Sequence, residues 1–164
     1  MWRTLTAARP ESAVPWLHLG IALQEAALLD KALACYEKAV QFDDNNGSAH
    51  RRLGMLEIVS GNIEKGETAL ETALARNPLG DAEVINAYGE LAKHFFDTGD
   101  YALSTRYFRK AIALNTQDGA DYAGLGHALH AMGEIEAALE IYREVLLRYP
   151  ESPATANAID ALYN

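Results

Sequence analysis

Two histidines are the side chains of this chain best placed to bind a metal ion. His127 and His130 lie three residues apart, which puts them one turn apart on a helix, and His94 could supply a third imidazole. Histidines at this spacing also recur by chance, so the pattern favours polar side chains that line a surface. We therefore expect no metal site.

Cys35 is the only cysteine, which excludes an internal disulfide and a cysteine-based metal cluster. No base can be named beside it, so we expect a buried, unreactive thiol. The sequence also lacks a nucleotide-binding loop, a nucleophile elbow and a paired-acid motif. We therefore predict that the chain is not an enzyme and needs no cofactor.

The composition is that of a folded domain, with 49% hydrophobic and 23% charged residues among 164. The net charge of -9 disfavours nucleic acid and anionic membranes as partners, because their phosphates require a basic surface. Polar residues interrupt the most apolar stretch, 14–29, so we expect no membrane insertion. The first residues lack the apolar core of a signal peptide. We expect a cytoplasmic location, or a periplasmic one if the chain is a fragment without its signal peptide.

The histidines and Cys35 lie within a pattern that recurs four times. The steps between Trp16, His50, Tyr88 and Tyr122 are 34, 38 and 34 residues. A period of this size is typical of a solenoid. Each repeat splits into two stretches with apolar or small residues at helical spacing. We predict helices at residues 12–27, 30–43, 47–60, 62–76, 82–98, 100–115, 119–132, 134–148 and 153–163.

Small residues mark the places where the two helices of each repeat should cross, because small side chains let helix axes approach closely. They are Gly20, Gly54, Ala92 and Gly126 on the first helices and Ala32, Gly66, Ser104 and Ala138 on the second. Glycine suits the left-handed residue that ends a helix, and Asp or Asn suits the N-cap of the next one. We assign these roles to Gly61, Gly99 and Gly133, and to Asp30, Asn62 and Asp100.

The pattern resembles the tetratricopeptide repeat, whose signature is Trp-x-x-Leu-Gly-x-x-Tyr, then Ala-x-x-x-Phe, then a closing Pro. The first copy reads Trp16-x-x-Leu19-Gly20-x-x-Leu23, then Ala32-x-x-x-Tyr36. The resemblance implies an all-α, right-handed α-solenoid of antiparallel helix pairs, with about four repeats and partial helices at both ends. The chain departs from the signature at four positions. Ala27 replaces a turn glycine, Glu57 replaces an aromatic residue, and Asp44 and Thr116 replace closing prolines.

We predict a single domain over residues 1–164. Its parts are the tail of a preceding second helix (1–11), repeat 1 (13–46), repeat 2 (47–80), repeat 3 with a four-residue insertion (81–118), repeat 4 (119–150) and a capping helix (151–164). The simplest account of the insertion is a first helix of repeat 3 that begins one turn early, near Asp81; the alternative is a lip on a groove. Asp160 occupies a small-residue position and indicates a solvated last helix. The opening half-repeat favours a fragment of a longer protein over a start site that leaves one capping helix.

In this family, the face beside the signature residues of each first helix resembles a concave groove that holds peptides. We therefore predict a partner-binding groove formed by Leu17, Ile21, Gln24, Arg51, Met55, Ile58, Asn86, Lys93, Phe96, His127 and His130. The apolar members would contact a protein segment, and Arg51 and Lys93 would meet acidic groups on it. The alternative is that the apolar members pack between neighbouring repeats.

These features together predict a non-enzymatic protein–protein interaction scaffold. Its partner would be a protein or peptide that the sequence does not identify. One alternative is a regulatory or assembly module of a larger enzyme or of a secretion protein. Another is a homo-oligomer that associates through the N-terminal half-repeat, at Trp2 and Leu5.

Overall fold

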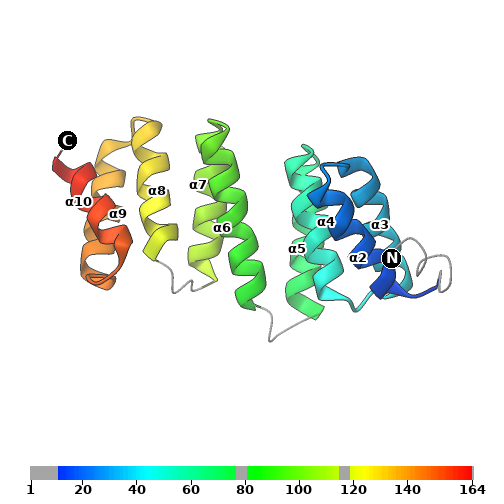
Figure 1. The fold of residues 1–164 in the computed structure, drawn as a ribbon. Coiled ribbons are helices and arrows are strands. Elements are labelled where there is room, and N and C mark those ends of the chain that lie inside the picture. The colour runs from blue at the N-terminus through cyan, green and yellow to red at the C-terminus, as the bar shows by residue number, and fades with distance from the viewer. Residues whose placement is uncertain (1–10, 77–80, 115–118, 164) are drawn as a thin grey trace. The chain divides into compact units, whose positions relative to one another are not determined.

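The computed structural model describes residues 11–76, 81–114 and 119–163, and all regular secondary structure in these ranges is helical (Figure 1). Every helix begins and ends within two residues of its predicted bounds, which confirms the all-α class. The helices are α2 (Ala13–Glu25), α3 (Leu29–Phe42), α4 (Gly47–Val59), α5 (Ile63–Arg76), α6 (Asp81–Asp97), α7 (Tyr101–Ala113), α8 (Gly119–Ala131), α9 (Ile135–Arg148) and α10 (Pro153–Tyr163). The predicted tail at residues 1–10, with Trp2 and Leu5, lies outside the described residues.

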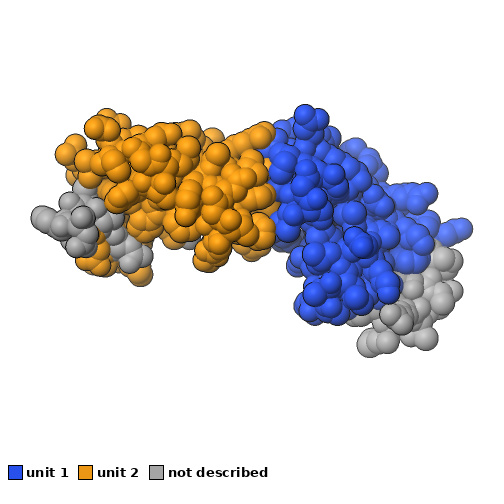
Figure 2. Space-filling model, turned by 90° about the horizontal axis from the view of Figure 1, so that it is seen from above, with its two compact units in different colours: residues 1–84 blue, residues 85–164 orange. Residues whose placement is uncertain are grey.

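The helices belong to two compact units, residues 1–84 (unit 1) and 85–164 (unit 2), coloured separately in Figure 2. In unit 1, α2 packs against α3 and α4 packs against α5, while α3 also contacts α4. In unit 2, α8 contacts α7, α9 and α10, and α9 contacts α10. The assignment of residues 1–164 to a single domain stays a prediction.

Glycine at the helix crossings brings the paired helices into contact. A methyl group on Gly54 would lie 2.7 Å from the carbonyl oxygen of Gly66. A methyl group on Gly126 would lie 2.7 Å from Cδ1 of Tyr142, which is buried. Neither position has room for a side chain, so these contacts confirm the crossings predicted at Gly54 and Gly126.

The turns inside the repeats use a left-handed residue. Gly61, Gly99 and Gly133 have φ of 94°, 84° and 80°, as predicted. In repeat 1 the alanine Ala27 takes this conformation, with φ of 56°. Helix α3 begins at Leu29 after Leu28 at the N-cap position, and Asp30 lies in its first turn, so the prediction of Asp30 as an N-cap is wrong.

Two other N-caps are formed by side chains. Asp100 accepts a hydrogen bond from the backbone N–H of Leu103 at 3.0 Å, which confirms its predicted role. Asn46 caps α4 in the same way, accepting from the N–H of Ala49 at 3.0 Å. Each cap satisfies one of the backbone donors that the first turn of a helix leaves without a partner.

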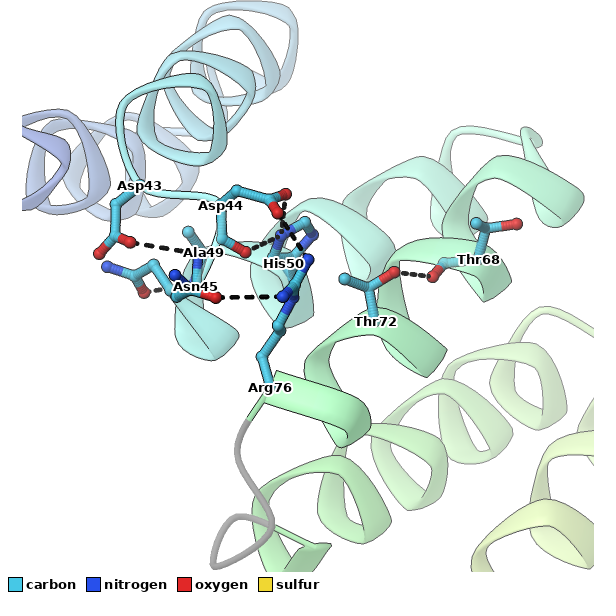
Figure 3. A network of polar contacts seen from close by, with 9 residues as sticks. Asp43, Asp44, Asn45, Ala49, His50, Thr68, Thr72 and Arg76 are labelled. Atoms are coloured by element: carbon cyan, nitrogen blue, oxygen red, sulfur yellow. Dashed lines mark hydrogen bonds and ion pairs between the residues drawn. The ribbon is translucent and has the colours of Figure 1, made fainter.

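Asp44 stands where the family signature has proline, and polar contacts hold the chain there (Figure 3). Arg76, at the end of α5, donates from Nη2 to Oδ2 of Asp44 at 2.6 Å and from Nη1 to Oδ1 of Asn45 at 3.1 Å. Nε2 of His50 lies 3.0 Å from the carbonyl oxygen of Asp44. Both helices of repeat 2 thus secure the connection from repeat 1.

Glu57 replaces an aromatic residue of the signature, and its fully buried carboxylate is neutralised locally. The Nζ of Lys65 forms an ion pair with Oε1 of Glu57, and Nδ2 of Asn62 donates to Oε2 at 2.7 Å. Lys65 also pairs with Glu37 of α3 at 3.0 Å. The hydrogen bonds to Glu57 and then Glu37 raise the pKa of Lys65 above its ordinary value. A charge network spanning α3, α4 and α5 thus occupies the position of the aromatic ring.

The four-residue insertion lengthens α6. This helix has 17 residues, whereas α4 and α8 have 13 each. It begins at Asp81, which confirms a first helix that starts one turn early. At the other end, Asp160 of α10 is exposed, as predicted for the last helix.

Candidate binding groove

A groove of about 650 Å³ lies on the face that α6, α8 and α10 form in unit 2. These are the helices that the sequence predicts as the first of repeats 3 and 4 and the capping helix. Phe108 of α7 also contacts the groove from the second helix of repeat 3. The groove is lined by Asn86, Gly89, Glu90, Lys93, Phe96, Asp97, Phe108, Ala120, Asp121, Ala123, Gly124, His127, Pro153 and Ala154.

Two glycines leave room for larger side chains that line the groove. Gly124 leaves room for the ring of Phe108, since a methyl group on Gly124 would lie 2.7 Å from Cε1 of that ring. Gly89 does the same for a carboxylate, since a methyl group there would lie 2.8 Å from Oδ1 of Asp121. Phe108 itself is 6% exposed, so its ring forms a fixed part of the groove wall.

The structure brings four of the predicted groove residues to this groove: Asn86, Lys93 and Phe96 from α6, and His127 from α8. His130 lies one turn further along α8, where it is exposed and does not line the groove. Burial lowers the pKa of His127 below its ordinary value of 6.5, and the neighbouring His130 acts in the same direction. His127 is therefore a neutral side chain of the groove at pH 7.

The predicted groove residues of unit 1 are engaged within the chain. Leu17 and Ile21 pack against the hydrophobic core of unit 1, as the alternative interpretation expected. Gln24 accepts a hydrogen bond from the hydroxyl of Tyr36 at 2.6 Å. Met55 is half-buried on α4. Leu17, Ile21 and Gln24 therefore have structural roles in unit 1.

Ile58 is fully buried, so its assignment to a partner-binding groove is wrong. It lies at the crossing of α4 with α5, where a methyl group on Gly66 would come within 2.9 Å of its backbone nitrogen. Ile58 lies at the edge of the predicted face, and it is buried in the helix crossing because Gly54 and Gly66 let α4 and α5 approach closely.

We expected Arg51 and Lys93 to contact acidic groups of a ligand, but both form ion pairs within the chain. Nε of Arg51 lies 3.3 Å from Oε2 of Glu83, and the Arg51 side chain is 17% exposed. Nζ of Lys93 lies 3.2 Å from Oδ2 of Asp97, one turn along α6. Both cations already have an acidic partner.

The groove of unit 2 carries more negative than positive charge. Its lining includes three carboxylates, Glu90, Asp97 and Asp121, against the single ammonium of Lys93, which gives a formal charge of -2. None of the groove residues predicted from the sequence is acidic. Asp121 was missed because it lies on α8, whereas the feature that leaves room for its carboxylate is the glycine at position 89 of α6.

Cys35 is buried, and burial raises the pKa of its thiol. Within the described ranges, no three histidine, cysteine or acidic side chains lie together in a way that could hold a metal ion. None of the described helices is long and apolar enough to cross a membrane.

Two curated proteins match most of this chain but are far longer. The Arabidopsis thaliana "Protein CTR9 homolog" is 24% identical in an alignment of 143 residues that covers 84% of this chain and 13% of that protein. The human tetratricopeptide repeat protein 7A is 26% identical over 138 residues, again 84% of this chain and 16% of that protein. The chain thus spans less than a fifth of either relative.

Solved structures share the fold. The structure of MamA matches with a TM-score of 0.68 and 20% identity, covering 92% of this chain and 85% of MamA. YrrB, described as a TPR protein with an unusual peptide-binding site, matches with a TM-score of 0.59 and 22% identity, covering 98% of this chain and 81% of YrrB. Three family models of the tetratricopeptide repeat match residues 13–46, 51–119 and 95–162. The chain belongs to the tetratricopeptide-repeat family and has the right-handed α-solenoid fold of that family.

Proposed function

We propose that the chain binds a segment of a partner protein, extended or helical, in the groove of unit 2. The fold is a protein–protein interaction scaffold, and the groove is the observation that carries the proposal. Its volume of about 650 Å³ falls within the range of about 300–1,000 Å³ that is common for ligand sites. Aromatic rings of Phe96 and Phe108 offer apolar contact, and the acidic residues and Asn86 offer polar contact. YrrB, which shares the fold, is described as having a peptide-binding site.

Filling the groove tests the proposal. Ala120 is exposed and lines the groove, so the Ala120→Trp variant places a large side chain in it without removing a core contact. Ala102→Trp adds the same side chain at an exposed position of α7 that does not line the groove. Peptides are selected on the wild-type chain from a random display library, and their affinities are measured by fluorescence anisotropy. A short segment is expected to bind with micromolar affinity, about -8 kcal/mol.

The two variants have opposite expected outcomes. Ala120→Trp should weaken binding of the selected peptides by about tenfold or more, since steric filling removes their site. Ala102→Trp should bind like the wild type, and both should keep the helical circular dichroism signal. Equal binding by wild type and Ala120→Trp would refute the groove as the binding site.

A further inference from the structure

We infer that the groove of unit 2 takes a basic segment, in which an arginine or lysine side chain lies beside an apolar one. This inference rests on the proposed function and specifies the chemistry of the partner. The pair of Lys93 and Asp97 is neutral as a whole, and the groove is also lined by the carboxylates of Glu90 and Asp121, so the formal charge of its lining residues is -2.

The two acids lie on facing helices. Glu90 is exposed on α6, directly after Gly89. Asp121 of α8 directs Oδ1 to within 2.8 Å of the place where a Gly89 methyl group would be. A cationic head group in the groove would therefore meet carboxylates from both helices, whereas an acidic ligand group would be repelled by both.

The apolar wall suits the rest of a basic side chain. Phe96 packs edge-on against Tyr101, with ring centroids 5.4 Å apart, and Phe108 is held almost fully buried below Gly124. Lysine and arginine lay their aliphatic stems along such surfaces while the charged end stays in a polar region. Aromatic faces add an attraction for the cation itself. The net charge of the chain, -9, favours the approach of the same class of partner.

The first test is the composition of the selected peptides. Peptides that bind the wild type but not Ala120→Trp should be enriched in arginine and lysine relative to the library. Groove-dependent binders that are acidic, or that lack basic residues, would overturn the inference and leave the proposed function standing. A library that gives no groove-dependent binder would contradict the proposed function itself.

The second test reverses one charge in the groove. The tightest selected peptide should bind Glu90→Lys about tenfold more weakly than the wild type, because an attraction becomes a repulsion at a partly exposed site. Glu140→Lys makes the same change on α9 outside the groove and should bind within about twofold of the wild type. A version of the peptide with glutamate for its basic residues should prefer Glu90→Lys over the wild type. Unchanged affinity of Glu90→Lys for the original peptide would overturn the inference.

Discussion

The two units carry the same repeat but use the same face of their first helices in different ways. At the position directly after the first signature residue, unit 1 has Leu17 and Arg51, which are half-buried. Unit 2 has Gly89 and Ala123 at that position, and both line the groove. Large side chains thus occupy this face in unit 1, while small ones leave it hollow in unit 2.

The units also differ in how they satisfy polar groups inside the fold. Unit 1 buries the carboxylate of Glu57 and neutralises it with Lys65 and Asn62. It also gives the hydroxyl of Tyr36 a partner in Gln24. In unit 2 the corresponding hydroxyl of Tyr142 is buried and has no hydrogen-bond partner among the described residues. The periodic positions build one scaffold, and the residues between them decide what each unit does with it.

The glycines at the helix crossings should contribute equally to the stability of both units. Gly126→Leu is expected to lower the free energy of unfolding by about 3 kcal/mol or more, because the buried ring of Tyr142 cannot move aside. In a chain of this size the melting temperature would fall by about 6–12 °C. Gly54→Leu in unit 1 should cause a comparable loss, and Ala131→Leu at an exposed position of α8 should cause little. A Gly54→Leu or Gly126→Leu protein that melts like the wild type would show that the crossing at that glycine tolerates a large side chain, which contradicts the prediction.

The charge network of unit 1 should be the next most sensitive feature. Lys65→Met leaves the buried Glu57 carboxylate without its cation, and we expect a loss of about 2 kcal/mol. This is below the usual cost of breaking a buried pair, because Lys65 is 57% exposed and water reaches it. Urea unfolding at pH 7 measures the loss. Lys31→Met, at an exposed position of α3, is the control and should be nearly neutral.

The same network predicts a pH dependence. The folded-state pKa of Lys65 is raised above 10.5, so its stabilisation is fully present below that pH and is lost as the pH rises through the raised pKa. The stability difference between wild type and Lys65→Met should therefore be constant near neutral pH and shrink above pH 10.5. A difference that grows in that range would contradict the role given to the ion pair.

Stability and binding should separate at Gly89. The Gly89→Ala variant puts a methyl group against the carboxylate of Asp121, which can rotate away because it is the end of a side chain. Alanine also favours the helix by about 1 kcal/mol, so stability should stay equal or rise slightly. Binding of the selected peptides should weaken severalfold, because the groove becomes shallower and an acid is displaced. Unchanged affinity would show that depth at this position does not matter.

One substitution should give unit 2 a hydrogen bond that unit 1 already has. Gln24 and His130 each precede the tyrosine of their repeat by 12 residues, and Gln24 accepts from the hydroxyl of Tyr36. His130→Gln should supply the same acceptor to Tyr142 and stabilise the chain by about 1 kcal/mol. The melting temperature should rise by about 2–4 °C, and His130→Ala should not reproduce the rise. A His130→Gln protein that gains no stability would show that the two positions differ in geometry.

Local sequence rules were sufficient to predict the helices of both units. The helical spacing of apolar residues and the turn glycines set the ends of α4 and α8, and four extra residues before Tyr88 became one extra turn of α6. Such signals depend on a residue and its near neighbours along the chain. The sequence therefore carries them in full.

The character of the groove was harder to predict because it depends on contacts between helices. Ile58 shares a helix face with Met55, yet the close approach of α5 at Gly66 buries it. We expected Arg51 of α4 to meet an acidic ligand, whereas Glu83 of α6 pairs with it. Asp121 faces the groove only because Gly89 on another helix has no side chain. No single stretch of sequence contains these pairings.

The smallest expected effect compares one turn in the two units. Ala27 in unit 1 and Gly133 in unit 2 have φ of 56° and 80°. A left-handed conformation costs a residue with a Cβ about 1–2 kcal/mol, while glycine loses about 0.4–1 kcal/mol more chain entropy on folding. Ala27→Gly should therefore raise stability by about 0.5 kcal/mol, and Gly133→Ala should lower it by about as much. Apart from Gly133 and its two neighbours along the chain, no described residue has an atom within 4 Å of a methyl group at Gly133, so steric contact with other parts of the fold does not enter. Urea unfolding of both variants measures the changes, and changes of the same sign would mean that the backbone conformation is not their cause.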